Sequence, residues 1–195
     1  MTSSSPLVSK ISQIIALSDA EQELIDTLFR PQSLHPGDFW LLEGQVCRHV
    51  AYIEEGLLRY TVNHDGDELT YSFGKETDFA SSYESFLTQS AATCAIQAIE
   101  PTRLRCITHE DLQRFYREVN EGERFGRLII EQIFLQTVHQ LTGLYTNTPE
   151  DRYLNFTRHF HDIQQRIPQY YLASYVGVKP QSLSRIRRRL ARTGR

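Results

Sequence analysis

The spacing of hydrophobic and polar residues changes along the chain, and one uniform region dominates its middle. From residue 34 to about residue 107, short apolar runs alternate with turn sequences roughly every 8–12 residues. Two such runs, Val50–Ile53 and Leu57–Val62, are separated by Glu-Glu-Gly. Evenly spaced short strands are typical of an all-β sandwich or barrel. We therefore predict a β-barrel here, with one short helix inserted at 78–92, where the spacing becomes helical.

The segments on either side of this region have other patterns. Residues 1–9 carry no periodic pattern and predict a loose tail. Ser18 and Glu21 form a capping box that starts a helix, and Pro31 ends that helix. After the barrel, Thr108 is placed to cap a further helix.

A long helical segment from 121 to about 145 carries apolar residues on more than one stripe. Two apolar faces must both be buried, one against the barrel and the other against a second copy of the same helix. The alternative, a fully buried core helix in a monomer, stays open. The residues that we assign to the dimer interface are Phe125, Leu128, Ile129, Ile133 and Leu135.

The stretch Pro168–Leu190 reads as two short helices joined by a tight turn. Gly177 supplies the positive φ that the turn needs. Ala173 is a small residue where the helices cross, while Leu183 and Ile186 close the core between them. This spacing predicts a helix-turn-helix, supported by a preceding helix at 152–161.

The second of these helices separates apolar from basic residues. Leu183, Ile186 and Leu190 lie within about 60° of one another and form a core stripe. An amide and four guanidinium groups lie on the opposite side, which suits a helix that enters the major groove of DNA. A solvated basic face on an ordinary surface helix is the alternative, and the turn spacing argues against it. These DNA-facing residues are Gln181, Arg185, Arg188, Arg189 and Arg192.

The charges of the chain are divided in the same way. Eight of the 21 Lys and Arg residues lie from Ile163 onward, where there is no acidic residue. The preceding part carries the other 13 basic residues and all 24 acidic ones. A basic segment beside an acidic body indicates that only the C-terminal part contacts nucleic acid.

Other classes of site and of location have little support in the sequence. Cys47, Cys94 and Cys106 lie far apart without a CxxC pair, so we expect buried free thiols and no metal or cofactor. The N-terminus lacks the basic and apolar regions of a signal peptide, and no run of 18 apolar residues occurs. We expect a soluble cytoplasmic protein with no membrane partner.

The order of barrel, long helix and helix-turn-helix, with Ala-Ser-Tyr-Val-Gly-Val-Lys-Pro-Gln-Ser-Leu-Ser-Arg-Ile-Arg at 173–187, resembles the Crp/Fnr family of bacterial transcription regulators. The resemblance is strongest over 149–190. It implies an α+β fold with a cyclic-nucleotide-binding-like β-barrel (jelly roll) over 1–120, a dimerisation helix over 121–146 and a helix-turn-helix domain over 147–195.

The resemblance also implies partners and base-reading residues. The expected partners are a double-stranded DNA operator with inverted repeats and a second copy of the chain, with RNA polymerase and an unidentified small-molecule effector as further candidates. Gln181, Ser182 and Arg185 fall on the family's base-reading positions. Lys179 replaces the Thr or Ser expected to cap the recognition helix and offers a phosphate contact.

The chain departs from the family in its phosphate cassette. Members that bind cyclic AMP carry Phe-x-Gly-Glu-Leu followed by Arg and then Ser or Thr, and the Gly, Glu and Arg are here Ser81, Ser82 and Ala92. Without that Arg nothing neutralises a cyclic phosphate, so we expect that cyclic AMP does not bind. The residues of this degenerate effector pocket are Phe79, Ser81, Ser82, Tyr83, Ala92 and Thr93.

Two further departures concern the ends of the chain. Members with an oxygen-sensing iron–sulfur cluster need N-terminal cysteines, and none precedes Cys47. The sequence ends five residues after Leu190, so we expect no β-hairpin wing after the recognition helix.

The leading hypothesis is a DNA-binding transcription regulator with a degenerate effector pocket. The first alternative is a small-ligand sensor that acts through a protein partner, with weak or vestigial DNA binding; the arginine face argues against it. The second is an enzyme on a cupin-like barrel, with a metal held by His35, His49 and either Glu43 or Glu54. Cupins need two close His residues and a distant third, a spacing that does not fit, so we expect no catalytic residue.

Overall fold

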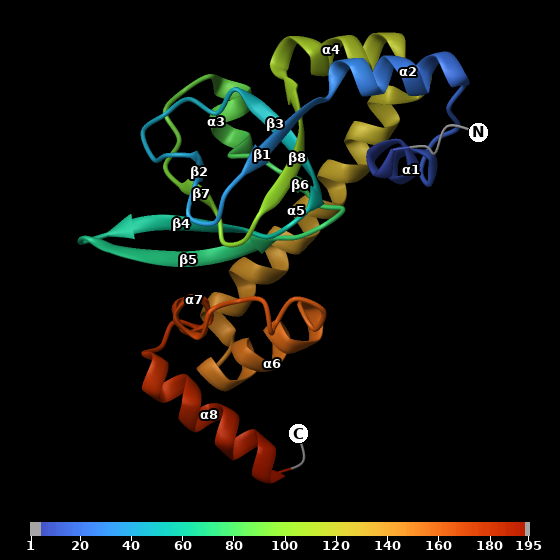
Figure 1. Ribbon diagram of the computed structural model, residues 1–195. Coiled ribbons are helices and arrows are strands. Elements are labelled where there is room, and N and C mark those ends of the chain that lie inside the picture. The colour runs from blue at the N-terminus through green and yellow to red at the C-terminus, as the bar shows by residue number, and fades with distance from the viewer. Residues whose placement is uncertain (1–4, 194–195) are drawn as a thin grey trace.

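The computed structural model describes residues 5–193. Eight strands form a sandwich of two four-stranded antiparallel sheets, and helices precede and follow it. In Figure 1 one long helix runs from beside the sandwich to three C-terminal helices. The predicted order of β-region, long helix and C-terminal helices is therefore confirmed.

The two sheets have the strand orders β1-β8-β3-β6 and β2-β7-β4-β5. The first sheet consists of β1 (Arg30–Leu34), β8 (Thr102–Thr108), β3 (His49–Glu55) and β6 (Phe79–Ala80). The second consists of β2 (Phe39–Leu41), β7 (Ala95–Ala98), β4 (Leu58–His64) and β5 (Asp67–Gly74). Strands β3 and β4 lie where the apolar runs predicted them.

The first strand begins earlier than the sequence analysis predicts. Pro31 does not simply end the preceding helix, because it lies inside β1, opposite Arg105 of β8. A proline lacks the N–H that a central strand needs, and β1 tolerates it because this strand lies at the edge of its sheet.

The prediction of a loose tail over 1–9 is wrong for the part that the structure describes, since α1 (Pro6–Ser12) is a helix. Ser5 caps it through the backbone N–H of Val8, and Pro6 suits its first turn. Leu7 and Val8 are buried in the core. Residues 1–4 of the predicted tail lie outside the described residues.

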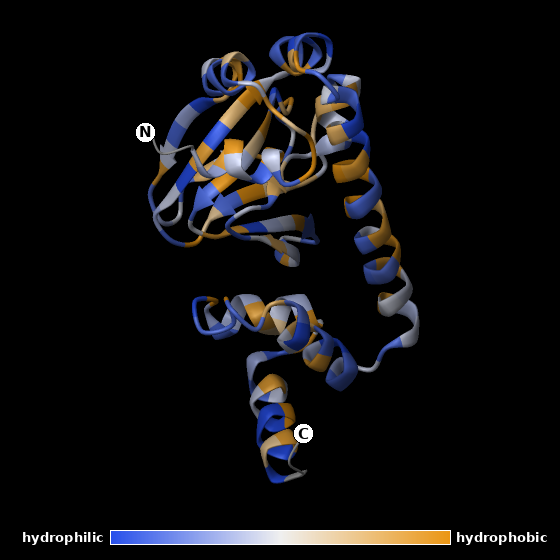
Figure 2. Cartoon of the chain, turned by 90° about the vertical axis from the view of Figure 1, so that its right-hand side faces the viewer, coloured by the Kyte–Doolittle hydropathy of each residue, from blue (hydrophilic) through white to orange (hydrophobic). Residues whose placement is uncertain are grey.

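Two of the other helices begin at the residues that the sequence predicts. The Ser18–Glu21 capping box starts α2 (Asp19–Leu28), and the Thr108 hydroxyl caps α4 (His109–Glu118). The short inserted helix is α3 (Tyr83–Thr88). The long helix is α5 (Gly122–Thr146), and Figure 2 shows apolar residues recurring along it.

The C-terminal helices are α6 (Pro149–His159), α7 (Gln169–Val176) and α8 (Pro180–Thr193). The helix predicted over 152–161 therefore begins three residues earlier, because Thr148 caps it, and it ends two residues earlier. Gly177 joins the last two with φ of +76°, a backbone conformation that residues with a Cβ rarely adopt. Ala173, Leu183 and Ile186 are buried where the helices meet. The two predicted helices and the tight turn at Gly177 between them are thus present.

The core of these helices continues into the β-sandwich. Leu57 and Phe73, from the β4–β5 region, belong to the same buried cluster as the apolar residues of α6, α7 and α8. The Phe73 ring contacts Phe156, Phe160 and Tyr175, with centroids 5.7–6.1 Å apart. The helices are therefore packed against the sandwich and share apolar core with it.

Polar contacts reinforce this packing at the α6–α7 connection. The Arg166 guanidinium bridges two carboxylates of the sandwich, donating to Glu76 at 2.7 Å and also to Glu100. The Lys75 ammonium lies 2.5 Å from an Asp162 carboxylate oxygen. Both pairs join residues far apart in the sequence.

A second set of contacts joins α7 to the β4–β5 hairpin. The Thr70 backbone N–H donates to the Ser174 hydroxyl at 2.8 Å. Arg59 is a buried arginine of β4 that pairs with Glu68 and stacks over the Tyr171 ring, 3.9 Å from its centroid. This role of Arg59 could not be predicted, because the sequence of a strand does not show which helix packs on it.

Candidate nucleic-acid interface and effector pocket

The exposed face of α8 carries the candidate DNA-binding residues. Leu183, Ile186 and Leu190 are buried against α6 and α7. On the opposite side, Gln181, Arg185, Arg188 and Arg192 are exposed. Figure 1 shows α8 at the end of the molecule farthest from the sandwich, so the sandwich does not cover this face.

Two other arginines of α8 make contacts within the chain. The Arg189 guanidinium pairs with the Glu150 carboxylate of α6. Arg187 was not predicted as a site residue, and its Nε donates to the Tyr153 hydroxyl at 3.1 Å. These two arginines therefore hold α8 against α6.

The turn between α7 and α8 is supported by residues that sequence analysis missed. The Gln169 amide donates to the Ser184 hydroxyl at 2.7 Å and so ties the two helices together. Arg152 of α6 donates to the carbonyl oxygens of Val176 and Asn147. Lys179 is exposed and Ser182 half-buried at the start of α8.

The second half of α5 exposes large apolar side chains. Leu135 is 59% exposed and Ile133 is 39% exposed, so both are accessible to a second copy. Phe134, Leu141 and Leu144 were not assigned to the interface, and they are 53–63% exposed.

The first half of α5 packs differently from the prediction. Phe125 was assigned to the dimer interface, but it is only 5% exposed and its ring contacts Phe79 and Phe115 in the core. Leu128 and Ile129 are half-buried, and Ile129 packs against the same core. Phe125 is therefore corrected to a core residue, because the apolar pattern of a helix does not show which stripe faces which partner.

A cavity of about 390 Å³ lies where the degenerate effector pocket was predicted. Four of the six predicted residues line it: Ser81, Ser82, Tyr83 and Thr93. Sequence analysis missed the other lining residues, which are Val62, Tyr71, Glu84 and Cys94.

The two remaining predicted residues lie outside this cavity. The Phe79 ring packs against Tyr52, 5.3 Å between centroids, and against Phe125. Ala92 is buried, and its backbone pairs with Gln45 and Gly44 at 2.8 Å. The six predicted cassette residues are therefore of two kinds in the structure: four line the cavity, and two pack in the core of the sandwich.

The effector pocket has no cationic side chain among its described lining residues. Its one charged group is the exposed Glu84 carboxylate. Burial, followed by a hydrogen bond with Cys94, raises the pKa of Tyr71, so this phenol stays protonated. Hydroxyls, a thiol and a carboxylate would not compensate the charge of a phosphate.

Two further features bear on the class of protein. Residues 5–193 hold no group of three or more His, Cys, Asp and Glu side chains that could bind a metal ion. The three cysteines are buried free thiols, as predicted. Within the same residues, no helix has both the length and the apolar character needed to cross a membrane.

Comparison with known proteins agrees with this geometry. The sequence profile of the cyclic nucleotide-binding domain matches residues 31–119. The catabolite activator protein of Thermus thermophilus has 17% sequence identity and a TM-score of 0.59, with 95% of this chain and 88% of that chain covered. None of the curated protein sequences matches the chain significantly.

Two more solved structures share the fold. A CooA mutant from Carboxydothermus hydrogenoformans has 14% identity and a TM-score of 0.72, and the match covers all of this chain and 87% of that one. A chain described as a Crp/Fnr-family transcriptional regulator from Eubacterium rectale has 18% identity and a TM-score of 0.69, covering 91% and 85%. Residues 31–119 are therefore a cyclic nucleotide-binding domain, in a chain that has the fold of the CAP and Crp/Fnr transcription regulators.

Proposed function

We propose that the protein is a dimeric, DNA-binding transcription regulator of the Crp/Fnr type. One observation carries the proposal: α8 presents an exposed amide and three exposed guanidiniums, at Gln181, Arg185, Arg188 and Arg192, from a packed helix-turn-helix. Arg and Gln are the side chains that read guanine and adenine by bidentate hydrogen bonds. The basic charge of this part of the chain supports phosphate contacts.

Dimerisation would bring two recognition helices together. The exposed apolar residues of α5, from Ile133 to Leu144, are the surface that a second copy would bury. Such a dimer presents its two α8 helices to successive major grooves, so the operator is an inverted repeat with half-sites about 34 Å apart or slightly more. In this arrangement residues 1–120 form the effector domain, 121–146 the dimerisation helix and 147–195 the DNA-binding domain.

The regulator would not respond to cyclic AMP. Among the described residues, none that lines the effector pocket carries a cation to neutralise the cyclic phosphate. Another small-molecule effector and RNA polymerase are the further partners of this proposal, which assigns no enzymatic activity and places the protein in the cytoplasm with its DNA.

Selection of bound DNA tests the proposal. The full chain is incubated with fragments of its own genome, and the retained fragments are sequenced. We expect a shared inverted repeat among them. The matched variant, Arg185→Ala with Arg188→Ala, should retain no such motif, since it removes two outward guanidiniums but no buried contact. Equal recovery of all fragments by both proteins would reject the proposal.

A further inference from the structure

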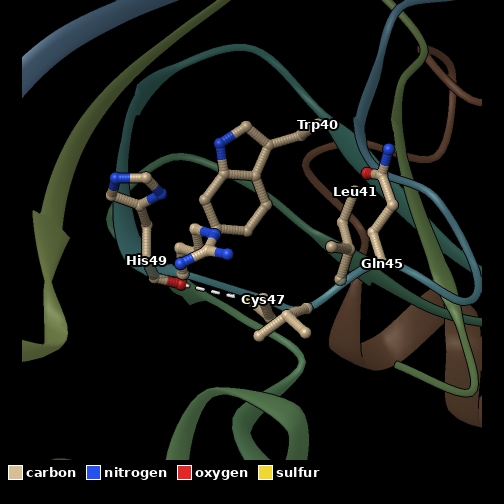
Figure 3. Close-up of a pocket in the computed structure, with 7 residues that line it drawn as sticks. Trp40, Leu41, Gln45, Cys47 and His49 are labelled. Atoms are coloured by element: carbon tan, nitrogen blue, oxygen red, sulfur yellow. Dashed lines mark hydrogen bonds between the residues drawn. The ribbon is translucent and has the colours of Figure 1, made fainter. Parts of the chain in front are cut away.

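A second cavity, also of about 390 Å³, lies on the other side of the effector-pocket wall. It is formed by β2, the loop after it and the start of β3, and it shares no lining residue with the effector pocket. Figure 3 shows the Trp40 indole extending across it towards the His49 imidazole, with Leu41 and Gln45 on the opposite side. The Cys47 thiol at its base lies 3.4 Å from the hydroxyl of Ser81, which lines the effector pocket.

The aromatic wall of this cavity is held in place. The Trp40 Nε1–H donates to the Gln32 side-chain oxygen of β1 at 3.2 Å, and the indole is half-exposed. An indole that is already held in place can stack on the planar ring of a ligand. Binding then costs no additional conformational entropy for ordering the tryptophan side chain.

The polar groups of the cavity are mainly hydrogen-bond donors. Arg48 is exposed, and its guanidinium has no ion pair or hydrogen bond with any described residue. The Gln45 oxygen accepts from the Leu42 backbone N–H at 3.2 Å, which leaves its NH₂ group available. Burial and the nearby Arg48 charge lower the pKa of His49, so this imidazole is neutral at neutral pH and keeps one N–H donor.

The cavity is also free of carboxylates, since no Asp or Glu lines it among the described residues. The charges of the two cavities are therefore opposite: the effector pocket carries a carboxylate and no cation, whereas this one carries a guanidinium and no anion. A guanidinium with free donors binds a carboxylate by two parallel hydrogen bonds.

We propose that this cavity is a second ligand site, which binds a small aromatic carboxylate. The ring stacks on the Trp40 indole, and the carboxylate pairs with Arg48 and accepts from the Gln45 amide. The site is independent of DNA binding, so it stands whether or not the protein is a transcription regulator.

The sequence contains a single tryptophan, Trp40, so its fluorescence reports on this cavity directly. The full chain is titrated with nicotinate, a planar anion, and with nicotinamide, its uncharged counterpart. N-acetyltryptophanamide under the same conditions corrects for collisional quenching. We expect nicotinate to give a saturable change in the millimolar range or tighter, and nicotinamide to bind about tenfold more weakly because it lacks the charge-assisted pair.

Two variants make the test specific. Arg48→Gln should weaken the binding of nicotinate by about tenfold and leave the binding of nicotinamide unchanged, since only the charged pair is lost. Arg117→Gln removes another exposed arginine, from α4, and should not change the binding of either ligand. The proposal is overturned if nicotinate quenches only as it quenches the free indole, if both ligands bind equally well, or if Arg48→Gln binds like the unmodified chain.

Discussion

The arginines of α8 are close in sequence but differ in what they contact. Arg187 rests on Tyr153 and Arg189 pairs with Glu150, whereas Arg185, Arg188 and Arg192 are exposed on the outer face. Each residue turns the direction of its side chain by about 100° around the helix axis, so neighbouring arginines face different surroundings. The same residue type thus contacts α6 at two positions of α8 and lies on the outer face at the other three.

The position of each exposed arginine along α8 predicts whether it contacts bases or phosphates. If the proposed function holds, the N-terminal half of α8 points at base edges, and Arg185 lies in that half. Arg185→Ala should then cost about 1–3 kcal/mol on the selected operator and little on scrambled DNA. Arg192 lies two turns further on, so Arg192→Ala should weaken both duplexes alike and lower the salt slope by about one. Fluorescence anisotropy at several salt concentrations measures both effects, with Arg117→Ala as the unaffected control. Equal weakening of both duplexes by Arg185→Ala would make that residue a phosphate contact only.

The effector pocket gives a second prediction at this scale. Calorimetry with millimolar cyclic AMP should detect no heat of binding, because Ser81, Ser82 and Ala92 replace the Gly, Glu and Arg of the family cassette. The described lining residues of the cavity also include no cation. A dissociation constant in the micromolar range would show that the phosphate is neutralised in some other way.

Sequence reasoning located the candidate site only in part. Gln181 and Arg185 could be predicted, because the turn at Gly177 fixes the phase of α8. The roles of Arg187 and Arg189 could not, since both depend on α6, which packs against α8 in three dimensions. Tyr71 was missed for a similar reason: it reaches the effector pocket from β5, which lies outside the cassette and in the other sheet from β6.

At the scale of elements, α5 changes its environment along its length. Its first turns pack on the core of the sandwich, where Phe125 is buried. From Ile133 onward the large apolar side chains face outward. A stretch of this kind is costly to leave in water, which favours burial against a second copy.

Substitution on the exposed half of α5 should produce monomers. Leu135→Glu places a charge at a position that is 59% exposed, so the monomer should still fold while the dimer loses stability. Light scattering and gel filtration measure the oligomeric state, and operator binding should be lost with the dimer. Gln136→Glu adds the same charge at the neighbouring exposed position and serves as the control. A folded, dimeric Leu135→Glu variant would place the interface elsewhere.

The elements that sequence predicted best are those with local chemical signals. The Ser18–Glu21 capping box and the Thr108 cap accept hydrogen bonds from backbone N–H groups in the first turn of their own helices. These signals therefore depend only on neighbouring residues. Helix α1 was missed because its stability depends on burying Leu7 and Val8 in a core formed by distant residues. The edge strand β1 was missed because a proline such as Pro31 is acceptable only at a sheet edge. The sequence around a strand does not show whether that strand lies at an edge.

At the scale of the whole molecule, the sandwich and the C-terminal helices are joined by charges as well as by core packing. Arg166 reaches both Glu76 and Glu100 across the boundary. Burial acts to raise the pKa of Glu76, but the hydrogen bonds from Arg166 and from the Gly56 N–H outweigh it and lower the pKa below its ordinary value of 4.5. A carboxyl whose pKa is lower in the folded state stabilises the fold above its unfolded pKa.

The pH dependence of stability should reflect this pair. The contribution of Glu76 is fully present above about pH 4.5 and is lost as the pH falls through the lower folded value. Urea unfolding should therefore show a smaller loss of stability on acidification for Glu76→Gln than for the unmodified chain, by up to about 1 kcal/mol because the pair is partly exposed. Glu55 is more exposed than Glu76 and pairs with Arg103, so Glu55→Gln should keep the pH dependence of stability of the unmodified chain. Identical slopes for all three proteins would contradict the linkage.

The apolar cluster that contains both Phe73 and Phe156 limits how this architecture can be recombined. A chimera that joined residues 147–195 to a different N-terminal domain would leave Phe156, Phe160 and Tyr175 without the Phe73 ring that packs among them. Exchange of N-terminal domains between proteins of this fold would therefore have to include the β4–β5 hairpin with the C-terminal helices. In evolution, these two parts are expected to vary together.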